Sequence, residues 1–403
     1  MDAGSLAPLM FLGLVVFLLL GYPVAFALAA NGLLFAGIGI AMGLFDVSLL
    51  SALPERVYGI VANPTLLAIP FFAFMGLILE RSGMAEDLLD TIGQLFGAMK
   101  GGLAYAVILV GGLLAATTGV VAATVIAMGL ISLPVMLRYG YDKRLASGVI
   151  AASGTLAQIV PPSLVLIVLA DQLGASVGDM YKGALLPGLG LIGLYLAFVF
   201  LVTLVRPHAA PAMPAAARTL HGPALLARVL TTLVPPLVLI FLVLGTIFLG
   251  VATPTEGGAM GAAGALLLAW ARGRLSRLQL TQAMDSTTKL TTFVIFILIG
   301  STIFTLVFRG LDGDVWVEHL FDHLPGGVIG FLIIVNLLVF TLAFFLDFFE
   351  IAFIVVPLLA PVAYKLGIDP IWFGVMLAVN MQTAFMHPPF GFALFYLKSV
   401  APK

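Results

Sequence analysis

The sequence contains no cysteine and very little charge. Of its 403 residues only 9% are charged, and the formal net charge is -1, whereas ordinary soluble domains are about 25% charged. The lack of cysteine excludes disulfides, thiolate nucleophiles and cysteine-ligated metals. The lack of a basic tract removes the electrostatic footprint of nucleic-acid binding, so we expect no nucleic-acid partner.

Hydrophobic residues make up most of the chain. They account for 62% of it, and apolar runs of about 20 residues, the length that crosses a hydrocarbon core, recur from end to end. Only Asp2 precedes the first run, whereas a cleavable signal needs a positive start, so we expect mature membrane helix from Ser5 onward. The composition predicts an all-α polytopic protein embedded in the lipid bilayer.

A set of unusual residues recurs 227 positions later in the chain. Two prolines in a row remove backbone donors and interrupt a helix, yet such a pair occurs twice in register. We interpret the halves as two copies of one unit, each with a broken transmembrane helix, which is the best sequence pointer to a secondary transporter's binding site. The recurring residues are Pro134, Gly140, Asp142, Pro161 and Pro162 in the first copy, and Pro361, Gly367, Asp369, Pro388 and Pro389 in the second.

The apolar pattern divides the chain into two repeats and a linker. In each repeat one apolar stretch is interrupted by a turn, and its arms, at 1.5 Å per residue, reach roughly 20–27 Å, short of the ~30 Å core. We therefore predict a re-entrant hairpin in each copy. The first repeat covers 1–183, with scaffold spans in 5–82, the hairpin at 101–137 and the broken helix at 145–170; a connecting span and cytoplasmic linker cover 184–228; the second repeat covers 229–403, with scaffold spans in 229–308, the hairpin at 328–363 and the broken helix at 371–397.

The distribution of Lys and Arg predicts the orientation, because cytoplasmic loops carry them in excess. The flanks of the second hairpin hold only Arg309 and Lys365, among several acidic residues. All the basic loops fall on one side if the N-terminus is periplasmic and the C-terminus cytoplasmic. The two copies are then inverted, as alternating access requires. The basic residues are Arg81, Lys100, Arg138, Lys143 and Arg144 around the first hairpin, Arg206, Arg218 and Arg228 in the linker, and Arg272, Arg274, Arg277 and Lys289 in the next loop.

Two acidic residues, Asp347 and Glu350, lie in the centre of the second hairpin. A charged residue at mid-membrane costs about 2.5–3.5 kcal/mol on insertion scales, so it normally faces protein or water. The pair could attract a cation, take up a proton or line the cargo site. The alternative is a buried structural pair, or a loop closer to the membrane surface.

Thr117, Thr118 and Gly119 occupy the equivalent region of the first hairpin. Hydroxyls and freed carbonyls supply hard oxygen ligands for Na⁺, and glycine lets backbone approach closely. The alternative is a simple turn whose hydroxyls bond back to the helix.

Polar residues also precede each Pro-Pro pair. Ser153, Gly154 and Thr155 align with Asn380, Met381 and Gln382, so both broken helices carry polar oxygens where they unwind. Small polar residues commonly form hydrogen bonds between membrane helices, but their occurrence twice beside a break favours an ion site. The candidate Na⁺ and substrate residues here are Ser153, Gly154, Thr155, Pro161 and Pro162 in the first repeat and Asn380, Gln382, Thr383, Pro388 and Pro389 in the second, with Na⁺ expected near Thr118, Ser153, Thr155 and Asn380.

His387 immediately precedes the second proline pair. It could bind anionic cargo or carry a proton, although a lone histidine is more often a hydrogen-bonded structural residue. The tract Thr253-Pro254-Thr255-Glu256, by contrast, has a complete structural explanation. Threonine at the N-cap, proline at N1 and glutamate at N3 form a capping box that starts a span, so we expect it to be scaffold.

These tracts resemble the large membrane subunit of tripartite ATP-independent periplasmic (TRAP) transporters over nearly the whole chain. Two tracts depart from the family pattern. Many relatives have a Ser-Gly-Ser-like first hairpin tip, and a threonine is common where this chain has His387. The matching tracts are Gly21-Tyr22-Pro23-Val24-Ala25-Phe26-Ala27-Leu28, Thr253-Pro254-Thr255-Glu256, Ala152-Ser153-Gly154-Thr155 followed by Pro161-Pro162-Ser163, and Asn380 followed by Pro388-Pro389.

The resemblance implies an elevator transporter of the ion-transporter superfamily in the bacterial inner membrane, and not an enzyme. It implies Na⁺ as the coupling ion, no organic cofactor, and a small organic anion of carboxylate or sugar-acid type as cargo. A periplasmic substrate-binding protein would deliver the cargo, and a small four-helix membrane subunit would complete the complex. Because the chain begins directly with the large subunit's first spans, we expect that small subunit to be separate.

Three other interpretations stay open at this point. The first is a stand-alone carboxylate or Na⁺/H⁺ elevator, which would need no receptor. The second is an intramembrane serine protease built on Ser153 and the distant His387, although the alignment of Ser153 with Asn380 already accounts for Ser153. The third is a channel.

Overall fold

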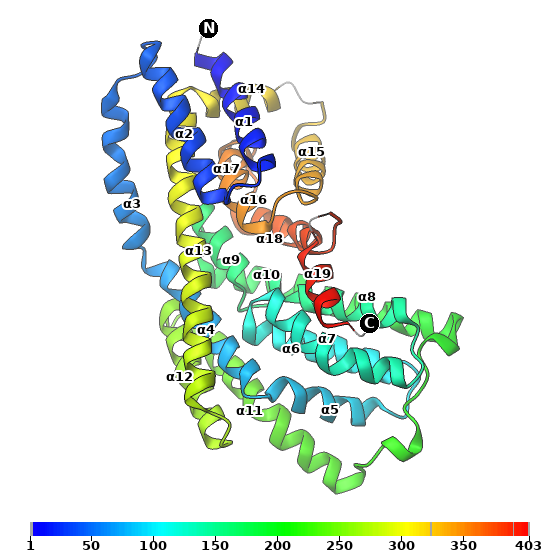
Figure 1. Cartoon of the computed structure of the whole chain (residues 1–403). Helices are drawn as coiled ribbons and strands as arrows, with labels where there is room; N and C mark the ends of the chain where they lie inside the picture. The colour runs from blue at the N-terminus through cyan, green and yellow to red at the C-terminus, as the bar shows by residue number, and fades with distance from the viewer. Residues whose placement is uncertain (1–2, 323–324, 390, 402–403) are drawn as a thin grey trace.

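A single long helix organises the molecule. The computed structural model describes residues 3–322, 325–389 and 391–401, and every regular element in these ranges is helical. Helix α13 (Arg277–Gly310) runs most of the height of the molecule, and α2 (Val24–Ala41) and α4 (Ala68–Arg81) pack along it (Figure 1). A Cβ on Gly300 of α13 would lie 2.3 Å from a carbonyl oxygen of α2, so a small residue permits this close crossing.

The first half of the chain contains a helical hairpin, α6–α7, followed by a helix that is broken at the Pro-Pro pair, α8–α9. An amphipathic helix, α5, precedes the hairpin. The elements up to the linker are α1 (Ala3–Leu19), α2, η1 (Val47–Ala52), α3 (Leu53–Val61), η2 (Pro64–Leu67), α4, α5 (Met84–Phe96), α6 (Gly102–Thr118), α7 (Val121–Arg138), α8 (Lys143–Thr155), η3 (Leu156–Gln158), α9 (Leu164–Gln172), α10 (Val177–Val205), η4 (Pro207–Ala209) and η5 (Ala215–Ala217).

The second half repeats the order of a hairpin, α15 to α17, followed by a broken helix, α18–α19. Its hairpin has a bent second arm, because α16 and α17 meet at 52°. The elements after the linker are α11 (Gly222–Phe248), α12 (Pro254–Ala271), α13, α14 (Gly313–Asp322), α15 (Gly327–Leu342), α16 (Phe348–Ile354), α17 (Val356–Lys365), α18 (Pro370–Met381), η6 (Gln382–Phe385) and α19 (Phe392–Val400).

The helices of the two halves coincide at the 227-residue shift. Helix α7 begins at Val121 and α16 at Phe348, and α8 begins at Lys143 and α18 at Pro370. The recurring aspartates explain the last pair, because each caps the helix that follows it. The side chain of Asp142 accepts from the amides of α8, and that of Asp369 accepts from an amide of α18, which satisfies donors that a helix start leaves open.

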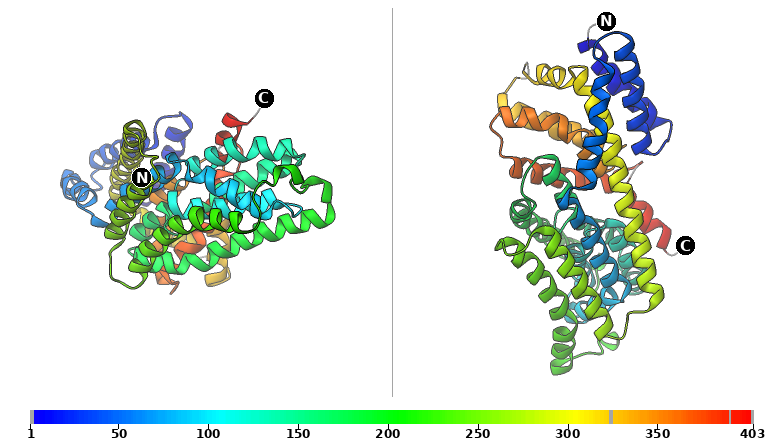
Figure 2. Two further views of the ribbon diagram at one scale, coloured as in Figure 1. Left: turned by 90° about the horizontal axis from the view of Figure 1, so that it is seen from below. Right: turned by 90° about the vertical axis from the view of Figure 1, so that its left-hand side faces the viewer.

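The two hairpins lie toward opposite ends of the molecule. The hairpin of the second repeat lies toward the end that carries the N-terminus, and that of the first repeat toward the other end (Figures 1 and 2). The fold class predicted from the sequence is therefore confirmed: an all-α membrane protein with two inverted repeats, each holding a hairpin and a broken helix.

Not every predicted span is long enough to cross a membrane as one straight helix. By length and composition, six segments of the described chain qualify, and the bent pair α16–α17 would be a seventh. One arm of the first hairpin, α7, is among the six; its 18 residues, at 1.5 Å per residue, reach about 27 Å, the upper end of the range expected from the sequence. The qualifying segments are α2, Pro64–Arg81, α7, α10, α11 and α13.

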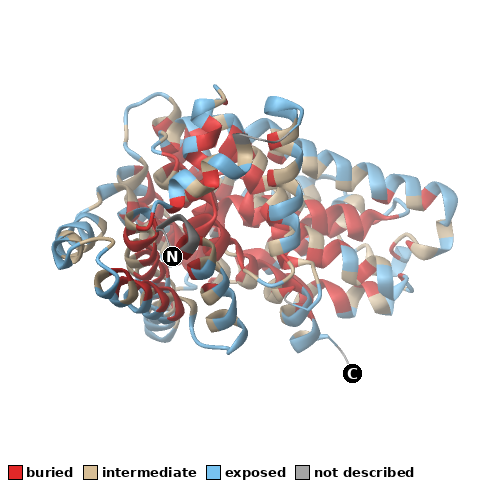
Figure 3. Cartoon of the chain, turned by 90° about the horizontal axis from the view of Figure 1, so that it is seen from above, coloured by how far each residue is buried: buried red, intermediate tan, exposed pale blue. Residues whose placement is uncertain are grey.

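Burial follows the hairpins and the broken helices. Buried residues concentrate where these elements meet, and the outer helices expose their side chains (Figure 3). In the 18-residue apolar window of α10 only 17% of the positions are buried. Because the exposed positions of α10 are mainly leucine and phenylalanine, this helix presents its outer face to lipid.

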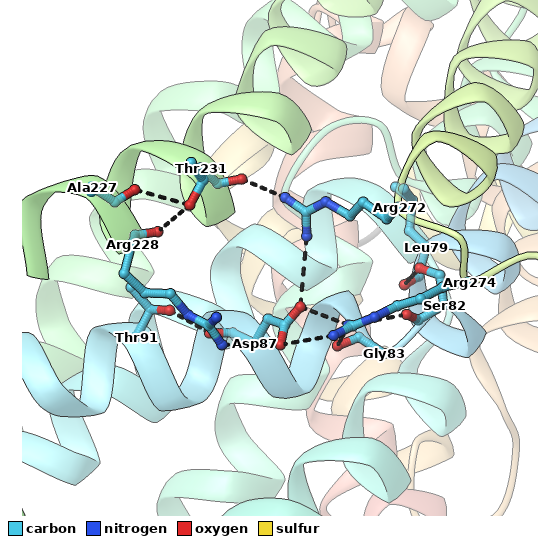
Figure 4. Close-up of polar contacts among 10 residues, drawn as sticks. All are labelled: Leu79, Ser82, Gly83, Asp87, Thr91, Ala227, Arg228, Thr231, Arg272 and Arg274. Carbon is cyan, nitrogen blue, oxygen red and sulfur yellow. Dashed lines mark hydrogen bonds and ion pairs between the residues drawn. The ribbon is translucent and has the colours of Figure 1, made fainter. Parts of the chain in front are cut away.

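An ion-pair cluster fastens α5 to the scaffold. The carboxylate of Asp87 on α5 lies 3.4 Å from Arg228 of α11, 3.7 Å from Arg272 and 2.6 Å from Arg274 (Figure 4). Arg272 also donates to the carbonyl of Thr231, which ties α11 to the turn between α12 and α13. One carboxylate therefore links the helix that precedes the first hairpin to two scaffold elements.

Candidate functional site

The tips of both hairpins meet at one cavity of about 290 Å³. Its walls come from the two hairpins, from both helix breaks and from the scaffold helix α13. Elements of both repeats that are far apart in the sequence therefore enclose one cavity. The lining residues are Gly119, Val120, Val121, Ala122, Gln158, Leu164, Leu290, Phe293, Asp347, Phe348, Phe349, Phe385, Phe392 and Tyr396.

The first hairpin touches the first helix break through Gly119. Its φ is +57°, a left-handed conformation that glycine adopts without steric cost. A Cβ at Gly119 would lie 3.4 Å from the carbonyl oxygen of Pro162, so hairpin and break approach through backbone atoms. Thr117 is buried and its hydroxyl donates to the carbonyl of Leu114, which leaves its lone pairs as possible ligands. The side chain of Thr118 lies outside the described residues.

The second hairpin tip is built around Asp347 and Glu350. The Asp347 carboxylate accepts from the amide of Glu350 at 2.8 Å, and the Glu350 carboxylate accepts from the amide of Asp347 at 2.9 Å. This reciprocal capping box starts α16 and gives both carboxylates a structural role at the helix N-terminus. Only Asp347 of the two lines the central cavity.

The two helix breaks are joined to each other near their centres. The amide of Gln382 donates to the hydroxyl of Thr155 at 2.9 Å and to Tyr195 at 3.1 Å. Thr155 and Gln382 are equivalent positions of the two repeats. Because a residue and its repeat equivalent can touch only near the axis that relates them, this hydrogen bond marks the pseudo-two-fold axis.

Both Pro-Pro pairs lie in the non-helical segments of the breaks. The peptide bond between Pro161 and Pro162 is cis, as is the bond between Pro388 and Pro389. In the first break the hydroxyl of Ser163 donates to the carbonyl of Gln158 at 2.6 Å and caps α9. Side-chain oxygens thus replace part of the helical hydrogen bonding that the prolines remove.

Ser153 and Gly154 face the first hairpin rather than the central cavity. The Ser153 hydroxyl donates to the carbonyl of Val149 at 2.6 Å, and a Cβ on Gly111 of α6 would lie 2.6 Å from the Cβ of Ser153. A Cβ on Gly154 would lie 2.2 Å from Val125 of α7. These residues hold α8 against the hairpin.

Asn380 and Thr383 line a different cavity, of about 900 Å³, between α10, α15 and α18. Asn380 donates to the backbone and side-chain oxygens of Asn336 at 2.9 and 2.8 Å, and its own Oδ1 is buried without a hydrogen-bond partner among the described residues. Thr383 donates to the carbonyl of Asn380. Ser153, Thr155 and Asn380 therefore do not share one cavity, and Na⁺ near these three remains a prediction.

His387 stacks on two aromatic side chains. Its ring centroid lies 4.3 Å from that of Phe344 and 4.6 Å from that of Phe340, and its buried Nδ1 has no hydrogen-bond partner in the described structure. The Ser153 hydroxyl donates to the carbonyl of Val149, so Ser153 and His387 do not form, in the described residues, the serine–histidine pair that a serine protease needs.

The comparison with known families decides the identity. The model of the family described as "Tripartite ATP-independent periplasmic transporter, DctM component" matches residues 11–403. The chain belongs to this family. It is a TRAP transporter large permease, a multi-pass inner-membrane transport protein and not an enzyme, and the family works with a periplasmic substrate-binding protein and a small membrane subunit.

Known proteins resemble the permease over most of its length. The C4-dicarboxylate TRAP transporter large permease protein DctM of Pseudomonas aeruginosa is 32% identical over 367 residues, covering 89% of this chain and 82% of that protein. The sialic acid TRAP transporter large permease protein SiaM of Vibrio cholerae is 27% identical, covering 92% and 87%. The crystal structure of the Alcanivorax borkumensis YdaH transporter matches with a TM-score of 0.59 at 15% identity, covering 88% and 82%, which is a likeness of fold.

Sequence reasoning missed several polar residues of the permease. Gln158 is 2% exposed, lines the central cavity, and its Oε1 has no hydrogen-bond partner among the described residues. Its position shortly before a Pro-Pro pair was an available signal. Asn336 is a polar residue inside an apolar run, which was also a signal. The sequence offers no comparable signal for Tyr195 and Tyr396, because a tyrosine in a membrane helix is common.

Proposed function

We propose that the permease imports a small organic anion across the inner membrane by a Na⁺-coupled elevator mechanism. The observation that carries this proposal is the central cavity, which both hairpin tips and both breaks enclose on one side and α13 closes on the other. In an elevator, the hairpins and broken helices move as one body past a fixed scaffold. Cargo held between the two parts changes its access when one part slides.

Backbone oxygens at the first tip fit a sodium ion. The approach of Gly119 to Pro162 places the Pro162 carbonyl oxygen of the break beside the hairpin tip, and carbonyl groups freed by a helix break coordinate Na⁺ in broken-helix transporters. The lone pairs of Thr117 would add a hydroxyl ligand. When bound, the ion supplies positive charge beside the cavity and couples the sodium gradient to cargo movement. We expect the remaining candidates, including Ser153, Thr155 and Asn380, to tune this site through packing.

We also propose the tripartite arrangement and the orientation for this chain. A periplasmic substrate-binding protein delivers the cargo, and a small four-helix membrane subunit stands beside the scaffold. The N-terminus is periplasmic and the C-terminus cytoplasmic. In support, the turn that carries Arg272 and Arg274 lies at the end of the molecule opposite the N-terminus (Figure 1), as an excess of cytoplasmic arginine requires.

Proteoliposome uptake tests the proposal. The permease and its small subunit are reconstituted, and uptake of radiolabelled organic anions is measured with the receptor, with and without an inward Na⁺ gradient. We expect uptake only when both the receptor and the gradient are present. Uptake by the permease alone would refute the tripartite part, and uptake that ignores the gradient would refute sodium coupling.

A further inference from the structure

Two grooves border helix α10. The first groove lies between α8 and α10 and consists of two adjoining spaces of about 640 and 370 Å³, which share Gly148, Val149 and Phe198. Helix α6 packs against both α8 and α10 and contributes Ile108 to the inner, smaller space. The second groove is the cavity of about 900 Å³ between α10, α15 and α18.

The two grooves are equivalent places in the duplicated fold. At the 227-residue shift α6 corresponds to α15 and α8 to α18, so each groove is formed by the first arm of a hairpin, the first half of a broken helix, and α10. Individual lining positions correspond as well. Arg144, Leu145 and Ser153 of the first groove are equivalent to Ile371, Trp372 and Asn380 of the second.

The equivalent grooves differ in charge. Arg144 and Arg206 line the outer space of the first groove, whereas the described lining residues of the second groove include no lysine or arginine. In the described chain neither guanidinium group takes part in an ion pair or a hydrogen bond. Asp142 also lines the outer space, but its carboxylate caps α8 by accepting from the amides of Arg144 and Leu145 at 2.8 and 3.2 Å. Two arginines and one carboxylate leave a surplus of one positive charge.

Away from the arginines the first groove is apolar. The outer space follows Phe198 and Leu201 of α10 and meets the inner space, which Ile108 lines. The polar residues of the inner space already have partners, because the hydroxyl of Ser153 donates to a carbonyl of its own helix and that of Tyr195 accepts from Gln382. An arginine at such a place keeps its charge at the interface while its stem lies on apolar surface. The groove therefore fits a molecule with an anionic head and an apolar tail.

We propose that the first groove binds an anionic phospholipid that carries a single phosphodiester charge. Its phosphate lies between Arg144 and Arg206, because guanidinium groups bind phosphate oxygens through paired N–H groups, and one acyl chain extends along α10 into the inner space. Basic pockets between membrane helices are typical sites for acidic head groups. A zwitterionic lipid brings an ammonium group of its own and leaves the surplus charge of the groove unbalanced. This site is separate from the central cavity, and it does not depend on the proposed transport mechanism.

Native mass spectrometry tests the lipid class. The complex of the permease and its small subunit, stripped of endogenous lipid in detergent, is titrated with phosphatidylglycerol, phosphatidylethanolamine and phosphatidylcholine of identical acyl chains. We expect phosphatidylglycerol to bind about fivefold or more tightly than either zwitterionic lipid, which is the factor that one charge near a membrane surface contributes. Equal binding of the three lipids would overturn the proposal, and so would displacement of phosphatidylglycerol by an equal concentration of inorganic phosphate.

The two arginines locate the head group. Arg144→Gln and Arg206→Gln each remove one charge from an exposed side chain, so misfolding is not expected. We expect each variant to weaken phosphatidylglycerol binding about fivefold and to leave phosphatidylcholine binding unchanged. Arg277→Gln is the matched control, since Arg277 is also exposed but lines neither groove; its effect should be less than about twofold. Equal losses in the three variants would overturn the assignment, because general attraction to charge would then explain the binding.

Gly148→Leu tests the acyl-chain position without changing the charge. Gly148 lines both spaces of the first groove, and a Cβ there would have no neighbour within 4 Å. Leucine favours the helix more than glycine does and fills the junction between the two spaces, so we expect phosphatidylglycerol binding to weaken about fivefold or more. Gly193→Leu on α10 is the control, because its Cβ also meets nothing within 4 Å and it lines neither groove. Similar binding by the two variants would contradict the position of the chain.

A comparison of the permease alone with the two-subunit complex distinguishes a lipid from a protein helix as the occupant. We expect the same arginine-dependent binding of phosphatidylglycerol in both samples. Binding by the permease alone that the small subunit abolishes would show that the partner covers the groove, and would overturn the lipid site. Uptake assays fail separately: absence of receptor-dependent, Na⁺-driven uptake would overturn the proposed function and leave the lipid site standing.

Discussion

The substitution Gly119→Ala tests whether the contact between the first hairpin tip and the first helix break is needed for Na⁺ binding by the permease. Gly119 has φ of +57°, and an alanine in the left-handed region costs about 1–2 kcal/mol. The new methyl group would also stand 3.4 Å from the Pro162 carbonyl oxygen and from Leu164. If the strain falls wholly on the ion-bound state, it corresponds to a factor of roughly 5–30 in affinity.

Gly140→Ala is the matched control. Gly140 also has a positive φ, +82°, so the backbone cost is comparable. It lies at the other end of α7, where its Cβ would meet only Pro211 at 3.8 Å. We expect both variants to lower thermal stability by a similar amount, which fluorescence-monitored unfolding of the purified proteins measures.

Sodium dependence of uptake distinguishes the two variants. We expect Gly119→Ala to raise the Na⁺ concentration for half-maximal uptake about tenfold, and Gly140→Ala to change it by less than about threefold. Equal changes in the two variants would refute the reasoning, because general destabilisation would then explain both.

Two further predictions concern contacts away from the tip. In a double-mutant cycle of Thr155→Val and Gln382→Leu, measured by thermal unfolding in detergent, we expect a coupling energy of about 0.6–1.7 kcal/mol, and additive effects would contradict the bond. Asp87→Asn should lower stability by about 1–2 kcal/mol, because three arginines lose their shared carboxylate in a partly exposed network. Asp90→Asn, on an exposed face of the same helix, should change stability by less than about 0.5 kcal/mol, and similar losses would argue against the cluster.

The sequence was sufficient to predict the repeat, the hairpins and the breaks, because these depend on local chemistry. The two proline pairs that recur at the 227-residue shift each lie at a helix break, whereas Pro235 and Pro236 lie inside the continuous helix α11, so the recurrence and not the pair alone is the signal. Asp142 and Asp369 cap the helices that follow them. Such features repeat at a fixed spacing and are readable without tertiary contacts.

The direction in which a polar side chain faces could not be predicted in the same way. Ser153 and Asn380 are equivalent in sequence, yet Ser153 packs on Gly111 and Asn380 bonds to Asn336. Both choices depend on which helix lies alongside, and that is set by packing over the whole fold. The role of Asp347 and Glu350 is an intermediate case, since their three-residue spacing permits a capping box but their place in the membrane suggested an ion site.

The hydrogen bond between Thr155 and Gln382 has a consequence for how the two repeats can change. In an assembly of two identical repeats this position would meet a copy of itself, so its two partners would have to be the same residue. A single chain that contains both repeats removes this restriction. It can place a hydroxyl on one side and a longer amide on the other, and thereby allow the two halves of the transport pathway to specialise.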